Sequence, residues 1–172
     1  MQMVKRIIGG FFLSILLLWL LAPKQELYYL LEKELKKNDI IISNETIKDT
    51  WFGVKLLNAD IYVKGAKMAQ VSELQLNIFF VYNTLIVKNI MVHEAMHNDA
   101  PKNIEETIVQ YSIIDPLNIK LNGLGSFGVL EGNIAFLDKH IHIVFPVAKD
   151  IKALKKFLKK DTTGEWKYET NY

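Results

Sequence analysis

The chain contains no cysteine among its 172 residues. It can therefore form no disulfide, hold no zinc through thiolates and use no cysteine nucleophile. It also lacks a strong excess of charge, because 21 lysine and arginine residues stand against 19 aspartate and glutamate residues. The net charge of +2 gives no general signature of polyanion binding. Phosphate loops, serine nucleophile elbows and nucleic-acid motifs are missing from the sequence as well. We expect no nucleic-acid partner and no cofactor.

What the sequence does have is one uninterrupted apolar run, residues 7–22, whose only polar side chain is Ser14. In lipid a helix satisfies its own backbone hydrogen bonds, so this run predicts a membrane anchor over residues 1–22. The run is slightly short of the roughly 20 residues that span a bilayer comfortably, and flanking lysine stems can extend it. The anchoring side chains are expected to include Ile7, Phe11, Phe12, Leu16 and Trp19.

The charges around the run predict the orientation of the chain. Lys5 and Arg6 precede it, and the positive end of such a segment tends to stay in the cytoplasm. A cleavable signal peptide has a similar layout, but Leu20 is large where a small residue is preferred, and Pro23 would directly follow the cut. We therefore expect a single-pass protein of a bacterial inner membrane, with its C-terminal part in the periplasm.

After the anchor, the pattern divides the chain into a helical stalk, residues 23–38, and one β-rich domain, residues 39–172. Leucines recur at helical spacing in the stalk, which begins at a proline. Residues 44–49 are polar and indicate a turn. Residues 68–80 alternate between apolar and polar side chains with one slip near Glu73, and residues 85–92 alternate again, which predicts a hairpin.

The C-terminal half of the domain combines strand patterns with one change of period. Glycines recur between 123 and 132 within a strand pattern, which indicates bends or close packing of the sheet. Residues 147–160 then show helical spacing of Ile151, Leu154, Phe157 and Leu158 among five lysines, and we expect this stripe to pack on the sheet. Trp166 and Tyr168 indicate a last edge strand.

The predicted fold class is mainly β with flanking helices: an N-terminal transmembrane helix, an elongated and curved antiparallel sheet of six to nine strands, and one late amphipathic helix. No helices alternate with the strands in sequence. One face of the sheet must therefore be covered by curvature, by a partner or by a ligand.

The order of these segments resembles that of a known family. An anchor is followed by a proline-led helix, then by "VSELQLNIFFVYNTLIVKNIMV", by "GLGSFGVLEGNIAFLDKHIHIVF" and by a Gly-Glu-Trp ending. This arrangement is similar to the type II secretion protein N family and the related AsmA-like proteins. The resemblance implies a curved antiparallel sheet facing the periplasm and a role in envelope machinery or lipid handling. It carries over no functional residue.

One motif could suggest an enzyme. His93, Glu94 and His97 match HExxH, which binds zinc when both histidines share a helix face. The preceding residues are strand-like and Pro101 follows closely, so the motif lacks a helix. In an extended strand its histidines would lie roughly 13 Å apart. His140 and His142 complete the set of histidines, and we interpret them as solvated strand residues. We expect no metal site and no catalytic residue.

Three functions stay open on the sequence. The first is a non-enzymatic, membrane-anchored component of an envelope assembly such as a secretion or motility machine. Its partners would be other envelope proteins, met through sheet edges and through Trp51, Phe52, Phe79, Phe80 and Tyr82. The second is a lipid-binding or lipid-transfer module with membrane lipid as its partner. Its apolar groove would be lined by Ile78, Phe80, Ile134, Phe136, Ile143 and Phe145. The third, a zinc peptidase, is the remote alternative.

Overall fold

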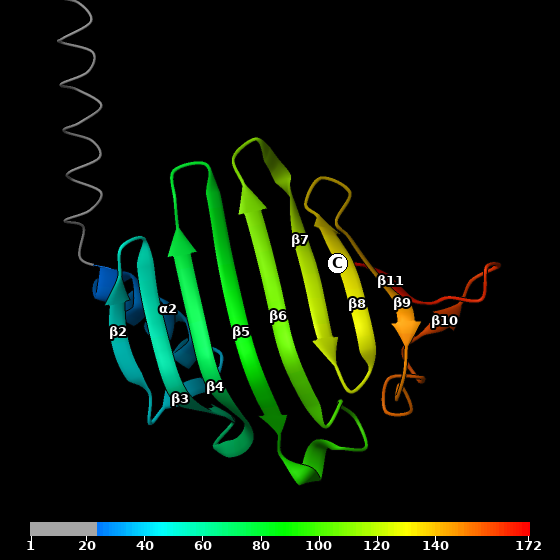
Figure 1. Ribbon diagram of the computed structural model, residues 1–172, viewed down its shortest axis with the longest axis horizontal. Coiled ribbons are helices and arrows are strands. Elements are labelled where there is room, and N and C mark those ends of the chain that lie inside the picture. The colour runs from blue at the N-terminus through cyan, green and yellow to red at the C-terminus, as the bar shows by residue number, and fades with distance from the viewer. Residues whose placement is uncertain (1–23) are drawn as a thin grey trace, which may run out of the picture.

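The computed structural model describes residues 24–172. The predicted anchor, including Ile7, Phe11, Phe12, Leu16 and Trp19, lies outside the described residues. Within the described range, no helix combines the length and the hydropathy needed to cross a membrane. The described part is mainly β: one helix, α2 (Lys24–Lys37), precedes a single open antiparallel sheet (Figure 1).

The sheet has 11 strands, against the six to nine expected from the sequence. Seven of them, β3 to β9, lie side by side in chain order, so the sheet is a meander of hairpins. β1 and β2 both pair with β3 at one end, and β11 followed by β10 completes the other. The bounds are β1 (Ile40–Ser43), β2 (Thr46–Thr50), β3 (Gly53–Val63), β4 (Ala66–Ile78), β5 (Tyr82–Val92), β6 (Asn103–Ser112), β7 (Asp115–Gly125), β8 (Gly128–Ala135), β9 (His140–Ala148), β10 (Lys159–Lys160) and β11 (Trp166–Asn171).

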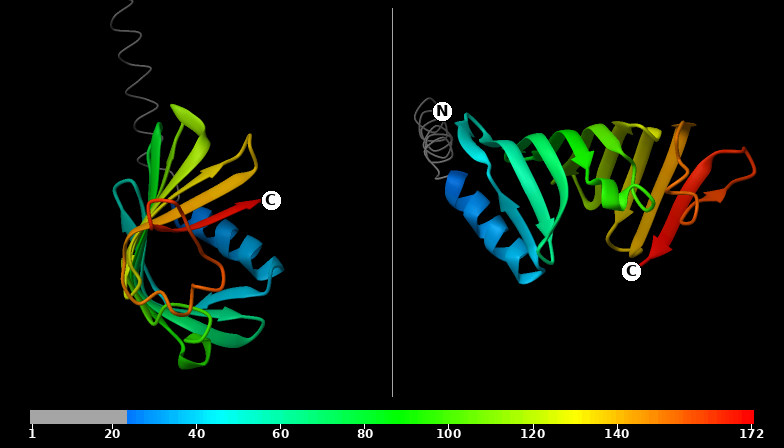
Figure 2. Two further views of the ribbon diagram at one scale, coloured as in Figure 1. Left: turned by 90° about the vertical axis from the view of Figure 1, so that its right-hand side faces the viewer. Right: turned by 90° about the horizontal axis from the view of Figure 1, so that it is seen from below.

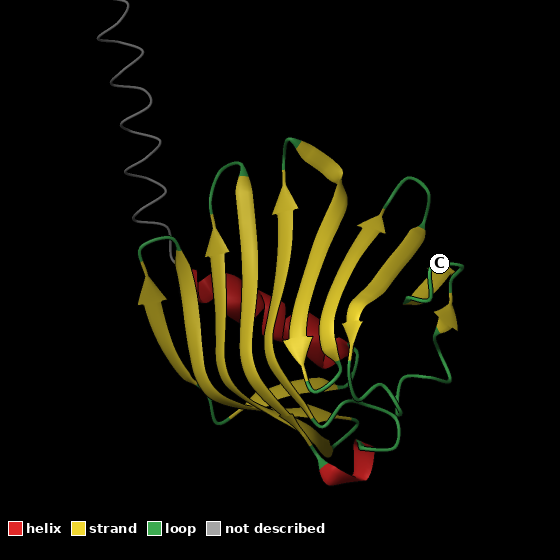
Figure 3. Ribbon diagram, turned by 45° about the vertical axis from the view of Figure 1, so that its right-hand side comes forward, coloured by secondary structure: helices red, strands yellow, loops and turns green. Residues whose placement is uncertain are grey.

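The strands bend along their length, so the sheet forms a trough that runs across them (Figures 2 and 3). Asn58 of β3 and Asn89 of β5 mark this bend, with φ angles of 56° and 52°. Asparagine tolerates this left-handed backbone better than most residues. At this bend the alternation of side chains between the two faces of the sheet shifts by one residue. Leu74 and Val71, which lie on either side of Ser72, therefore both pack into the same core although they are three residues apart. This is the slip in alternation that the sequence shows near Glu73.

Helix α2 covers the concave face at one end of the trough (Figure 2). Tyr28 is 1% exposed there, and its hydroxyl donates a 2.7 Å hydrogen bond to Glu45. Leu35 packs against the same core, whereas Leu30 and Leu31 are exposed. The predicted stalk is therefore a helix that lies on the sheet. The buried side chains of this core are Tyr28, Ile42, Val54, Leu56, Ala59 and Val71.

The predicted late helix over residues 147–160 is wrong. β9 continues to Ala148, and the chain then makes consecutive turns until β10 begins at Lys159. Ten residues, 149–158, remain between these strands, which is short for a helix that gains little from propensity alone. Lysines three and four residues apart would also repel one another along a helix. The apolar stripe nevertheless packs on the sheet as expected, with Ile151 only 4% exposed.

The predicted turn over residues 44–49 is also wrong in part, because β2 begins at Thr46 and pairs with β3. Ile47 is its single apolar residue, so the strand shows almost no alternation in sequence. It lies at an open edge, where a strand can form with little apolar content of its own. The predicted hairpin of residues 68–92 is confirmed by β4 and β5. The strand predicted at Trp166 is confirmed by β11, but β10 pairs with its outer side, so β11 is not the outermost strand.

Asp60 is a buried carboxylate of β3, on the face of the sheet opposite Ala59 and Ile61, and we expect it to make folding sensitive to acid. Its carboxylate forms an ion pair with Lys67 Nζ at 2.8 Å and accepts a hydrogen bond from Asn44 Nδ2 at 2.9 Å, and these contacts lower its pKa, with Lys67 the larger cause. A lowered folded-state pKa stabilises the protein above the unfolded value of about 4, and this stability is lost as the pH falls through the folded value.

We therefore expect Asp60→Asn to lower the melting temperature at pH 7 and to flatten its decline between pH 5 and pH 2, as measured by circular dichroism. Asp138→Asn, at an exposed turn, is the matched control and should keep the wild-type profile. A decline that is equally steep in Asp60→Asn would assign acid sensitivity to other carboxylates.

Candidate apolar ligand site

The two faces of the sheet differ in chemistry. Partnered residues of neighbouring strands lie on the same face, so the strand register assigns side chains to the concave or the convex side. On the convex face, one row of partnered residues across the strands consists of Lys55, Gln75, Ile86, Ile108, Asn122 and Glu131. The concave face is almost wholly apolar in two adjacent rows: Val54, Leu76, Leu85, Val109, Leu121, Gly132 and Ile143, then Leu56, Leu74, Val87, Thr107, Gly123 and Leu130.

A hollow of about 440 Å³ lies on this concave face at the end opposite helix α2. Its size falls in the range of small-molecule sites. Thr107 and Tyr168 are the polar members of a lining that is otherwise apolar. The floor consists of Ile104, Thr107, Leu121, Leu130, Ile143 and Tyr168, and the walls of Pro101, Phe127, Phe145, Leu154, Phe157 and Leu158.

The wall of the hollow depends on residues 149–158, which we call the strap. Lys149 N–H donates to Phe127 O at 2.8 Å, and Asp150 N–H to Ser126 O at 3.1 Å, which fixes where the strap begins. Ile151 is buried with Phe127 and Phe145, whose rings meet edge to face at 5.8 Å. The strap therefore stands over the concave face as a wall (Figure 2).

Electrostatic contacts hold the outer side of the strap. Lys156 forms an ion pair with Asp99 in the connection between β5 and β6. The Nζ atoms of Lys155 and Lys160 lie over the Trp166 ring, 5.6 and 5.7 Å from its centroid. Cation–π contacts of this kind contribute about 0.5–1 kcal/mol at exposed sites. The lysines of the sequence pattern are thus exposed, while Leu154, Phe157 and Leu158 of the apolar stripe line the hollow.

The six residues expected from the sequence to line a groove lie in three different places. Ile143 and Phe145 line the hollow. Ile78 and Ile134 lie on the same concave face by register, two residues beyond Leu76 and Gly132. Phe80 and Phe136 are 39% and 44% exposed in the turns that follow β4 and β8. The structure thus brings two of the six residues into the hollow.

Sequence reasoning missed the residues that define the floor and one wall. Leu121 and Leu130 lie in a region with a strand pattern in the sequence, so pairing its segments in register could have placed Leu121 beside Gly132, which in turn pairs with Ile143. Phe127 gave no such signal, because it stands in a Gly-Ser-Phe-Gly turn where an exposed residue is the usual expectation.

The four histidines lie in two separate places. His93 and His97 flank a 3₁₀ turn, η1 (Glu94–Met96), after β5. His93 Nδ1 accepts from Ala95 N–H at 3.4 Å, and a ring nitrogen of His97 lies 3.0 Å from Val92 O. His140 and His142 lie on β9, near the opposite edge of the sheet. The HExxH motif has no α-helix to place both histidines on one face.

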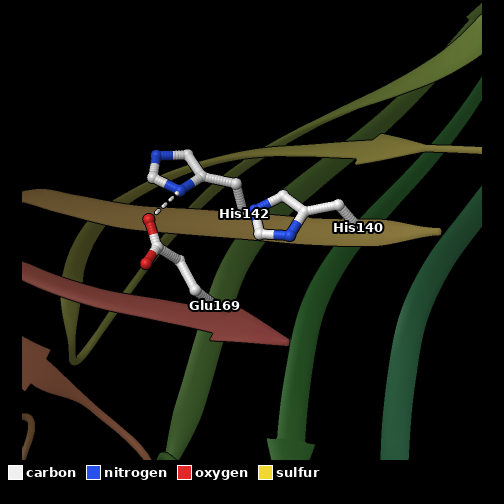
Figure 4. Close-up of side chains that lie close together, drawn as sticks. All are labelled: His140, His142 and Glu169. Atoms are coloured by element: carbon white, nitrogen blue, oxygen red, sulfur yellow. Dashed lines mark hydrogen bonds and ion pairs between the residues drawn. The ribbon is translucent and has the colours of Figure 1, made fainter. Parts of the chain in front are cut away.

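Among the described residues, His140, His142 and Glu169 form the group that could hold a metal ion, with ligand atoms within 4.8 Å of one another (Figure 4). His142 Nδ1 lies 3.0 Å from Glu169 Oε1. The Lys167 ammonium also donates to Glu169 at 3.2 Å and, with His142, lowers the pKa of that carboxyl. A cation would have to compete with Lys167 on an exposed surface, so we build no metal chemistry on this group.

No family model, no curated protein and no solved structure matches this chain. The resemblance to the type II secretion protein N family therefore stays a prediction.

Proposed function

We propose that this chain is a non-enzymatic, membrane-tethered protein of the bacterial envelope whose trough takes up the acyl chain of a lipid. The observation that carries the proposal is the hollow under the strap, whose lining is apolar except for Thr107 and Tyr168. Such a lining offers surface for a hydrocarbon chain and few groups for acid–base or nucleophilic chemistry.

The apolar surface extends beyond the hollow. Leu85, Val87 and Val109 continue its floor toward helix α2, and all three are half-buried. An acyl chain has only apolar atoms to bury, so a long floor of this kind suits it better than it suits a compact polar metabolite. The bound chain would run across the strands, along the axis of the trough.

The test uses the full chain in lipid vesicles and a fatty acid that carries a photoreactive diazirine. After illumination, digestion and mass spectrometry, we expect labelled peptides from β6, β7 and the strap, and excess oleate should suppress this labelling. Labelling of the N-terminal apolar peptide serves as an internal reference for the amount of probe that is dissolved in the bilayer.

Thr107→Phe is the decisive variant, because the added ring would occupy the hollow from its floor. We expect it to lose the strap labelling. Thr84→Phe is the matched control, since Thr84 pairs with Asn77 and Gln110 on the convex face of the adjacent strand and should keep the labelling. Equal labelling of both variants would contradict an acyl chain in the trough.

The role as a subunit of an envelope assembly is the second proposal, and it would use a surface of the sheet other than its open edges. Both ends of the sheet carry unpaired edges in the described range, with β1 and β2 at one end and β10 and β11 at the other. These edge strands are short, and β10 consists of Lys159 and Lys160, features that discourage strand addition. Crosslinking and co-purification from native membranes would identify a partner that binds elsewhere.

A further inference from the structure

The most exposed large apolar side chains of the described range gather at one edge of the sheet. Ile114 is 86%, Trp51 77% and Leu137 73% exposed, the three highest values among them. They belong to three different hairpin turns, β6–β7, β2–β3 and β8–β9, which lie at the upper edge in Figure 1. We call this edge the turn rim, and its other exposed apolar residues are Phe52, Phe79, Phe80, Val81, Ile113 and Phe136.

The opposite edge of the sheet has a different composition. Its turns consist of Lys64 and Gly65, of the polar segment 93–102, and of Ser126 and Phe127. Phe127, the large apolar side chain of its own turn, folds inward and is 3% exposed. Met91, Leu124 and Val147 at strand ends and Phe157 of the strap are also exposed toward this edge, but its hairpin turns carry no exposed large apolar side chain among the described residues. Exposed apolar side chains that gather along one edge indicate an interaction surface.

The turn rim lies on the side from which the chain enters the domain. Gln25 Nε2 donates to Asp49 Oδ2 at 3.0 Å, which places the start of helix α2 beside the turn that carries Trp51. Residue 24 follows the apolar run 7–22 almost directly, and the sequence predicts that this run is embedded in a bilayer. The edge that carries the exposed side chains is thus the edge nearest to that membrane.

The chemistry of the rim fits the interface of a bilayer. It offers a tryptophan, phenylalanines and branched aliphatic side chains, the residue types that favour this depth. The charges of its turns nearly balance, since Asp115 and Asp138 stand with Lys139. Attraction to anionic headgroups is therefore a minor contribution, and insertion of apolar side chains provides the binding.

We propose that the turn rim inserts into the surface of the membrane to which the chain is tethered, so that the sheet stands with this edge in the lipid interface. The proposal shares the membrane tether with the proposed function but does not depend on a ligand in the trough, because it rests on the exposed turns and on where helix α2 begins.

The absence of cysteine allows a direct test on the full chain in phosphatidylcholine vesicles. Ile114→Cys and Leu137→Cys each carry an environment-sensitive nitrobenzoxadiazole label at the rim. Asn98→Cys and Thr162→Cys, both exposed and away from the rim, are the matched controls. We expect blue-shifted emission and quenching by nitroxide-labelled lipid at both rim positions, with neither effect at the controls.

The labelled variants are compared by their melting temperatures, which should equal that of the wild type because all four positions are exposed. Rim labels that emit as in water and escape the nitroxide would overturn the proposal and leave a protein partner as the occupant of this edge. Quenching of rim and control labels alike would also overturn it, because the molecule would then have no membrane-facing edge.

Discussion

Replacing Gly128 with alanine is expected to destabilise the domain by roughly 3 kcal/mol or more. Gly128 begins β8 with a φ of 99°, a backbone conformation that costs other residues about 1–2 kcal/mol. A Cβ atom there would lie 1.7 Å from Val147 O, so β9 would also have to move. Displacing packed structure for one added group typically costs a further 1–3 kcal/mol.

Gly65→Ala is the matched control for this prediction. Gly65 also has a positive φ, 80°, but a Cβ atom there would meet nothing within 4 Å. The Gly65→Ala substitution should therefore lower the free energy of unfolding only through the strained backbone conformation, by about 1 kcal/mol. Thermal unfolding of the full chain in detergent, followed by circular dichroism, compares the two. Equal melting temperatures would show that the contact with Val147 O relaxes freely.

Replacing Phe127 with alanine is expected to cost about 3–5 kcal/mol, the usual range for a buried phenylalanine. Phe127 is 3% exposed and packs edge to face on Phe145. The loss should be local, because Phe127, Phe145 and Ile151 form a core separate from the one under helix α2. Hydrogen exchange should therefore rise in the strap and β11 and stay unchanged in α2 and β3.

The control for this second prediction is Phe157→Ala. Phe157 lines the same hollow but is 54% exposed, so its removal should cost less than about 1 kcal/mol. Faster exchange in α2 after Phe127→Ala would mean that both cores unfold as one unit and would contradict the division described here.

The strand content could be predicted from the sequence because most of the sheet has one apolar face. The alternation of residues 68–80 and 85–92 matches β4 and β5, and even its irregularity near Glu73 reports the bend of the sheet. The prediction failed where local pattern and environment disagree. β2 has one apolar residue, so its strand depends on pairing with β3 and leaves no signal of its own.

The strap shows the opposite failure. Its apolar residues have helical spacing, yet the ends of residues 149–158 are fixed by hydrogen bonds to the β7–β8 turn and by the start of β10. These fixed ends set the span that the segment must cover, and tertiary contacts override a weak helical preference. The hollow could not be foreseen for the same reason, because the strap contributes three of its residues.

Strands β3 to β9 follow one another in the sheet in the order of their synthesis. Each new hairpin can therefore pair with the strand made just before it, without waiting for distant sequence, and a structure with such local contacts folds quickly. Helix α2 and β1 to β4 would complete the first core while later strands are still being made. The strap and β11 follow all of these strands in the chain, so the trough of a nascent molecule has no strap wall until residues 149–172 have been synthesised.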